Sequence, residues 1–131
     1  MSLLLFDHVN IRTANLATMS AFYSEVLGMP AGYRPPFGFG GAWHYCGEQP
    51  AVHLVEMDRP PRTEDPQLEH FAFQARDMAA FLKQLREKDI PYRIAVVPEL
   101  EIHKVNIADP DGNHIHIDFT AEDAVAAGAA G

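Results

Sequence analysis

Histidines are the residues of this chain whose number and spacing indicate chemistry. The sequence holds seven histidines against ten lysines and arginines combined. Imidazole binds divalent metals and carries protons near neutral pH. Four of the seven fall at two similar pairs of positions, because His53 follows His8 by 45 residues and His116 follows His70 by 46 residues. The spacing predicts a site built from a repeated unit, whereas any one histidine alone is as well explained as an ordinary hydrogen-bonded residue.

Two similar runs of elements position these histidines. Apolar residues at three- and four-residue spacing predict a helix over 14–28 and a second helix that begins after Asp77 and ends near Lys88. Alternating or continuous apolar runs predict strands, punctuated by glycine and proline. The expected strands are 3–11, 31–34, 41–46 and 51–57 in the first half, and 68–75, 92–97, 102–108 and 113–119 in the second.

The alternation of side chains along a strand places the histidines on polar faces. In 113–119, His114, His116 and Asp118 share one face, opposite an apolar face. His70 and His8 each lie opposite the strongest apolar residues of their own strands. If the two halves curl into one sheet surface, these imidazoles converge, and three or four ligands from separate strands suit a catalytic metal site with an open position.

The repeat also predicts the organisation of the chain. Its 131 residues favour one domain over 1–120, made of two β-α-β-β-β modules in a curved mixed sheet of the α+β class. Module one spans 1–58, a proline-rich linker spans 59–67, and module two spans 68–120. The alanine- and glycine-rich segment 121–131 is expected to be a flexible tail, with a short terminal helix as the alternative.

Composition narrows the class of partner. The formal net charge is −8, and no cluster of lysine and arginine exceeds two residues, so nucleic acids and anionic membranes are poor partners. No apolar run approaches the length of a membrane span, and no export signal is expected. The single cysteine, Cys46, is expected to be buried and inert, and the cytoplasm is the expected compartment.

Four segments carry a resemblance to a known family. They are Asp7–Ile11, the helix end Phe22–Met29, Glu69–Phe73 and the turn-and-strand segment Asp109–Ile117. Over about residues 4–120 the chain resembles the vicinal oxygen chelate superfamily, which includes glyoxalase I, extradiol dioxygenases, and the bleomycin and fosfomycin resistance proteins. The resemblance implies its glyoxalase/bleomycin resistance/dihydroxybiphenyl dioxygenase-like fold, a small-molecule substrate and a homodimer.

The resemblance also implies a ligand set. The metal ligands correspond to His8, His70 and His116, with His53 as a fourth ligand where one is used. The ion is expected to be divalent iron, zinc, nickel, manganese or cobalt. His53 and His114 are each assigned to the metal or to the substrate pocket. Where the family usually has a glutamate this chain has His116, so the proton-transferring base of glyoxalase-like isomerases is absent unless a carboxylate such as Glu56 replaces it.

A substrate pocket is expected around the glycine- and proline-rich segment 35–41. Its residues are Arg34, Phe39, Trp43 and Tyr45, although the two aromatic strand residues fit a core or a dimer interface equally well. His44 and His103 are expected at the surface or at the pocket rim. Asp118 is expected to orient a histidine ligand.

These features predict a metal-dependent enzyme that acts on a small oxygen-chelating substrate as a dioxygenase, lyase or isomerase. The missing glutamate favours dioxygenase-like or lyase-like chemistry, and no catalytic residue is assigned. The alternative is a metal-free small-molecule binding protein of the bleomycin-resistance type.

Overall fold

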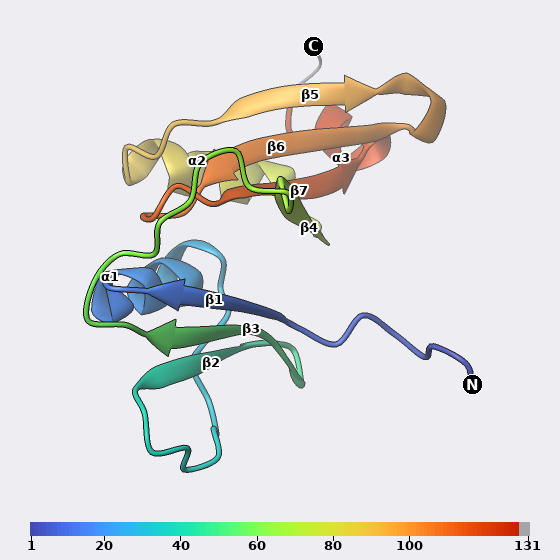
Figure 1. Cartoon of the computed structure of the whole chain (residues 1–131). Helices are drawn as coiled ribbons and strands as arrows, with labels where there is room; N and C mark the ends of the chain where they lie inside the picture. Colours follow the sequence, from blue (N-terminus) through green and yellow to red (C-terminus); the bar gives the residue numbers. More distant parts are fainter. Residues whose placement is uncertain (129–131) are drawn as a thin grey trace. The chain divides into compact units, whose positions relative to one another are not determined.

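The structure, a computed structural model, describes residues 1–128, and the chain divides into two compact units at residues 64 and 65. Unit 1 contains β1 (Val9–Thr13), α1 (Leu16–Ala21), the π-helical turn η1 (Phe22–Val26), β2 (Gly41–Cys46) and β3 (Gln49–Glu56). Unit 2 contains β4 (His70–Gln74), α2 (Met78–Glu87), β5 (Arg93–Val97), the short 3₁₀ helix η2 (Pro98–Leu100), β6 (Ile102–Ala108), β7 (His114–Thr120) and α3 (Ala121–Ala126). Each unit is a mixed sheet with helices, which confirms the predicted α+β class (Figure 1).

Unit 1 is a three-stranded sheet in the order β1-β3-β2. β1 runs parallel to β3, and β2 pairs with β3 antiparallel. The helical segment supplies fully buried Met19 and Tyr23 to the core, and β3 supplies Val52 and Leu54. Burying these side chains is the main term that holds the unit together, at about 1.5–3 kcal/mol for each large apolar side chain.

Unit 2 is a four-stranded sheet in the order β4-β7-β6-β5, with β4 parallel to β7 and the other pairs antiparallel. Asp77 caps α2 as predicted, because its carboxylate accepts a hydrogen bond from the Ala80 amide at 3.3 Å. Met78 and Leu85 of α2 are fully buried, as is Ile115 of β7. The apolar face of β7 is therefore committed to the core, which leaves the opposite face for polar side chains.

The strand register of the two units confirms the repeat. Val9 of β1 pairs with Val52, so His53 lies two positions beyond the residue opposite His8. In unit 2, His70 pairs with His114, and His116 again lies two positions beyond that partner. In each unit, therefore, one histidine lies before or at the start of the first strand. A second histidine lies on the last strand, two positions beyond the residue opposite the first.

Three predicted elements differ from the structure. The strand expected over 3–11 begins only at Val9, and the strand expected over 31–34 is reduced to a single bridge between Ala31 and His44. Prolines 30, 35 and 36 flank that second segment and cannot donate ladder hydrogen bonds. The helix expected over 14–28 spans residues 16–26, and its last turn is π-helical.

The segment 121–131 is not a loose tail throughout, because residues 121–126 form α3, the alternative left open above. Thr120 caps this helix by accepting a hydrogen bond from the Asp123 amide. The Asp123 carboxylate accepts hydrogen bonds from the amides of Asp77 and Met78 at 2.7 and 3.2 Å, so α3 satisfies the exposed start of α2. Residues 129–131 of the expected tail lie outside the described residues.

Candidate functional site

Besides His114, which faces Glu69, three histidines have a carboxylate against the Nδ1 atom of the ring. The pairs are Asp7 with His8 at 2.7 Å, Glu69 with His70 at 3.2 Å, and Asp118 with His116 at 2.6 Å. A carboxylate on Nδ1 fixes the tautomer and directs the lone pair of the ring onto Nε2. These are the three residues that the sequence indicated as metal ligands, and Asp118 occupies the orienting position expected of it.

His116 offers the clearest ligand atom. Its side chain is 6% exposed, and its Nδ1–H donates to Asp118. Its Nε2 atom is buried, and no residue of 1–128 provides it with a hydrogen-bond partner. A buried polar atom without a partner costs about 1–3 kcal/mol, so an external partner at this nitrogen would relieve a real penalty. The donor set, neutral imidazole nitrogens oriented by carboxylates, fits a borderline divalent metal.

The strand pairing of unit 2 brings three histidine rings together. The centroid of the His70 ring lies 4.4 Å from that of His116 and 5.2 Å from that of His114. All three side chains project from the same face of the β4–β7 pair, because paired residues of a parallel ladder share a face. His70, His114 and His116 therefore form a cluster within unit 2.

Glu69 is a member of this cluster that the sequence reasoning missed. Its carboxylate contacts Nδ1 of both His114 and His70, and these hydrogen bonds, that of His114 first, lower the pKa of Glu69 below its usual range. Glu69, His70 and His114 each offer a ligand atom, all within 4.8 Å of one another. Glu69 lies just before β4, where side-chain alternation no longer predicts direction. The recurrence of an acid directly before the first histidine of each half was the available signal.

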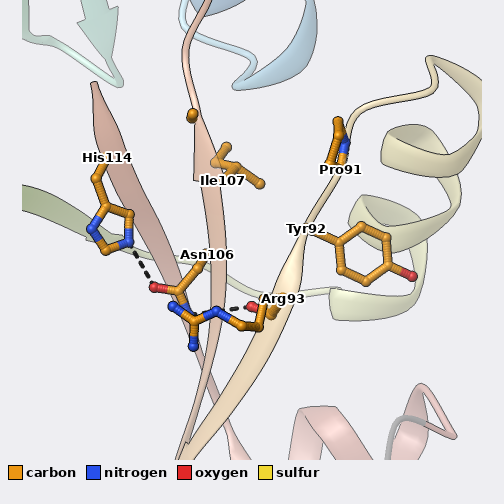
Figure 2. Close-up of a pocket in the computed structure, with 7 residues that line it drawn as sticks. Pro91, Tyr92, Arg93, Asn106, Ile107 and His114 are labelled. Carbon is orange, nitrogen blue, oxygen red and sulfur yellow. Dashed lines mark hydrogen bonds between the residues drawn. The ribbon is translucent and has the colours of Figure 1, made fainter. Parts of the chain in front are cut away.

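The hydrogen bonds of His114 distinguish it from the other two rings. Its Nδ1 faces Glu69, and its Nε2 lies 2.8 Å from Asn106 Oδ1 (Figure 2). The Asn106 amide nitrogen donates to the main-chain oxygens of Arg93 and Lys104, so the amide presents its oxygen to His114. Both ring nitrogens of His114 therefore face hydrogen-bond acceptors. This is the arrangement of a side chain that hydrogen bonds hold in place.

The corresponding histidines of unit 1 form a stack. The His53 ring lies 3.8 Å from His8 and 4.0 Å from Trp43, and the three rings are nearly parallel, so His53 is sandwiched between the other two. His53 Nε2 lies 3.0 Å from the Pro50 carbonyl oxygen, to which it donates. Burial, followed by the neighbouring His8, lowers the pKa of His53 below its usual value. His53 is thus held as a neutral ring within a packed layer.

Residues expected to line a pocket in unit 1 make contacts within its loop. The Arg34 guanidinium donates to the Phe39 carbonyl at 2.9 Å and lies about 5 Å from the ring centroids of Phe37 and Phe39. The Tyr45 hydroxyl donates to the Tyr33 carbonyl at 2.6 Å. These contacts bind the loop to itself, as expected where glycine and proline leave backbone groups without ladder partners.

Two further expectations, those for His44 and Cys46, are wrong. His44 is fully buried rather than at the surface, with hydrogen bonds to Ser20 and the Met29 carbonyl, so it is a core histidine. Cys46 is exposed rather than buried. Glu56 lies against Gly40 at the loop of unit 1, and His103 is half-buried on β6 with no hydrogen-bond partner for its Nδ1 among residues 1–128.

Unit 2 also contains a cavity of about 400 Å³ that borders His114 (Figure 2). Its walls come from the start of β5, the end of β6 and the first residue of β7, and they comprise Pro91, Tyr92, Arg93, Asn106, Ile107, Ala108 and His114. None of Arg34, Phe39, Trp43 and Tyr45 lines it. From the sequence, Arg93 and Arg34 each could pair with a substrate carboxylate, although an ordinary exposed arginine is the favoured interpretation of both.

Comparison with known proteins identifies the family of this fold. The family model described as the Glyoxalase/Bleomycin resistance protein/Dioxygenase superfamily matches residues 5–117. The chain belongs to the Glyoxalase/Bleomycin resistance protein/Dioxygenase superfamily.

Solved structures share the fold at low identity. A glyoxalase/bleomycin resistance protein/dioxygenase domain from Frankia sp. EAN1pec aligns with a TM-score of 0.75 and 17% identity, over 91% of this chain and 93% of that one. The trypanothione-dependent glyoxalase I of Leishmania major aligns with a TM-score of 0.69 and 20% identity, over 97% and 94%. The lactoylglutathione lyase of Agrobacterium tumefaciens aligns with a TM-score of 0.64 and 21% identity, over 86% and 90%.

At these identities the structural matches establish the fold alone. No curated protein sequence matches the chain significantly. Among the described residues, no helix has the length and apolar character needed to cross a lipid bilayer.

Proposed function

We propose that this chain is a metal-dependent enzyme of its superfamily that acts on a small, oxygen-chelating substrate. In unit 2 the metal ligands would be the Nε2 atoms of His70 and His116. In unit 1, taken by itself, His8 is the histidine with the same carboxylate arrangement. The ion would be divalent, and reaction types consistent with the residues are dioxygenase, lyase and isomerase chemistry. We also propose that the protein is a cytoplasmic homodimer. Size-exclusion chromatography with light scattering would test whether it is a dimer.

The observation that carries the proposal is the buried Nε2 atom of His116. It has no partner within the described chain, while Asp118 holds the opposite nitrogen of the same ring at 2.6 Å. Core histidines are normally satisfied at both nitrogens, as His44 is by Ser20 and the Met29 carbonyl. An imidazole with one nitrogen oriented by a carboxylate and the other unpartnered has the arrangement of a metal ligand.

The imidazoles of the proposed site also indicate which substrate groups it would favour. Neutral imidazoles do not reduce the charge of a divalent ion, so the site favours an anionic oxygen ligand such as a carboxylate, enolate or phenolate. A divalent ion held there would polarise the chelating oxygens of a substrate and stabilise negative charge on them. Glu69 is a carboxylate of unit 2 placed among the histidines, and its lowered pKa keeps it ionised, as a hydrogen-bond acceptor for their rings.

Metal analysis of the purified protein tests the proposal. We expect about one divalent ion per chain by elemental mass spectrometry, lost in His70→Ala and in His116→Ala. The matched control is His103→Ala, a half-buried histidine of the same sheet that lies outside the cluster, which should retain the ion. Far-UV circular dichroism would establish that each variant folds.

Two results would overturn the assignment. A native protein that carries no stoichiometric metal and takes up none from zinc, nickel, manganese, cobalt or ferrous salts would favour the metal-free binding protein instead. If His114→Ala loses the ion while His116→Ala keeps it, the ligand set is Glu69, His70 and His114 and the role given to His116 is wrong.

A further inference from the structure

The cavity of unit 2 has a polar edge and an apolar side. Arg93 is the cross-strand partner of Asn106, and His114 is the partner of Ala108, so these side chains lie on the polar face of the sheet. Pro91 and Ile107 contribute the apolar lining. A volume of about 400 Å³ lies within the range of small-molecule sites, which run from about 300 to 1,000 Å³.

The charge of this lining is opposite to that of the chain. The sequence carries 18 acidic and ten basic residues, yet no acidic residue lines the cavity, and Arg93 and His114 do. Figure 2 draws the Arg93 side chain beside Asn106, with His114 hydrogen-bonded to the same asparagine. Within residues 1–128, no hydrogen bond or ion pair engages the Arg93 guanidinium. The cavity therefore carries at its edge an exposed arginine whose guanidinium has no partner among the described residues.

The repeat supplies an internal control for this interpretation. Arg34 follows Tyr33 in unit 1 as Arg93 follows Tyr92 in unit 2. The Arg34 guanidinium is occupied by the Phe39 carbonyl and by two phenylalanine rings. The Tyr92 hydroxyl, in contrast, accepts a hydrogen bond from Arg86 at 3.3 Å, and its ring points away from Asn106 in Figure 2. Within residues 65–128, no main-chain carbonyl accepts a hydrogen bond from the Arg93 guanidinium as the Phe39 carbonyl does from Arg34.

A single guanidinium beside an apolar wall selects among anions. A carboxylate is matched by the two parallel donors of one arginine. A phosphate dianion usually takes several donors, such as a helix N-terminus or clustered lysines, and the cavity lining contains neither. The apolar residues at the other side favour a compact hydrocarbon or aromatic body over a second charge.

We propose that this cavity binds the carboxylate of a small substrate with an apolar body, through the Arg93 guanidinium, with His114 as part of the cavity wall. Asn106 is a positioning residue, because its oxygen fixes the His114 ring at the cavity wall. Calling the ligand a substrate rests on the proposed function, whereas the preference for a carboxylate rests on the cavity alone.

The test uses three probes on the full chain, namely benzoate, its uncharged counterpart benzyl alcohol, and phenyl phosphate. Binding would be followed by amide chemical shifts in ¹H–¹⁵N spectra of protein dialysed against EDTA. We expect benzoate to shift the amides at 91–93, 106–108 and 114 with a Kd on the order of 1 mM. Benzyl alcohol should bind about 10-fold more weakly or worse, and phenyl phosphate no more tightly than benzoate.

Two substitutions test whether benzoate binds at Arg93. Arg93→Gln should raise the Kd for benzoate about 10-fold or more, since it removes a charged hydrogen-bond pair. Arg76→Gln, an exposed arginine of the same unit outside the cavity, should change it by less than about 2-fold. Metal content should be equal in both variants, so loss of benzoate binding and loss of the metal are separate results.

Three outcomes would overturn the proposal. Equal binding of benzoate and benzyl alcohol would show that charge is not recognised, and an unchanged Kd in Arg93→Gln would exclude this arginine. Tighter binding of phenyl phosphate would assign the cavity to phosphate monoesters instead. If wild-type protein holds no metal but Arg93 still governs benzoate binding, the proposed function fails while the carboxylate pocket stands.

Discussion

Units 1 and 2 use one strand register for two different purposes. Both place a histidine on the last strand two positions beyond the partner of the first-strand histidine. In unit 1 that residue, His53, lies between two flat rings and donates to the Pro50 carbonyl. In unit 2 it is His116, held by Asp118 on one side and unpartnered on the other.

The difference teaches that position within a repeat does not fix the role of a residue. What decides the role is the partner of each ring nitrogen. A main-chain carbonyl on Nε2 commits His53 to the packing of its unit, whereas a carboxylate on Nδ1 leaves the Nε2 of His116 available. The comparison predicts that equivalent substitutions in the two units have unlike effects.

The largest effect is expected from removing the two equivalent histidines one at a time. His116→Ala should weaken metal binding by more than the about 10–100-fold that orienting partners contribute, because it deletes a ligand atom. His53→Ala should weaken it by less than about 10-fold. Competition with a chromogenic chelator measures both affinities, and equal losses in the two variants would abolish the distinction drawn between the units.

The stacked rings of His8, His53 and Trp43 in unit 1 are expected to stabilise the fold. Trp43→Ala removes one face of the packing around His53 and should lower the free energy of unfolding by about 2 kcal/mol. This is less than the about 3–5 kcal/mol typical of a fully buried aromatic residue, because Trp43 is half-buried. Urea unfolding measures it. Tyr33→Ala, whose side chain is exposed, serves as control and should change stability by about 0.5 kcal/mol or less. A stable Trp43→Ala protein that has lost its metal would reverse the assignment.

Replacing the carboxylates that orient the histidines should weaken metal binding to different degrees, according to how exposed each carboxylate is. Asp118→Asn should reduce metal affinity about 10-fold, because the Asp118 side chain is 19% exposed and its hydrogen bond to His116 is shielded from water. Asp7→Asn should have a smaller effect, since the Asp7 side chain is 69% exposed. Calorimetric titration of the metal-free variants with zinc compares the two, and a larger loss for Asp7 would contradict the ranking.

The smallest effect concerns pH. The folded state lowers the pKa of His53, mainly through burial, so the unfolded chain takes up a proton at this residue before the folded chain does. This contribution to stability is present above the unfolded pKa, near 6.5, and declines as the pH falls below it. His53→Gln should therefore lose less stability than wild type between pH 7.5 and 5.5 in urea unfolding. Parallel pH profiles for the two proteins would show that burial of His53 carries no such penalty.

Much of the fold and part of the site follow from local patterns. Alternation placed His114, His116 and Asp118 on one face of β7, and the capping chemistry of Asp77 placed the start of α2. These features depend on residues within a few positions of one another, so a single sequence is enough to predict them.

The rest depends on contacts between distant segments. The joint contact of Glu69 with His70 and His114 needs two strands 45 residues apart to pair in register. The Pro50 carbonyl that engages His53, and the loop that occupies Arg34, follow from backbone paths that no periodic pattern describes. The shortened strand near Ala31 shows the same limit, because prolines around it outweigh an extended-looking sequence.

The hydrogen bonds of Asp123 have a practical meaning for anyone who handles this protein. A chain cut after residue 120 would lose the carboxylate that receives the Asp77 and Met78 amides, and with it α3. Expression boundaries and fusion joints on the C-terminal side therefore belong beyond Gly128, where the last described turn has already closed.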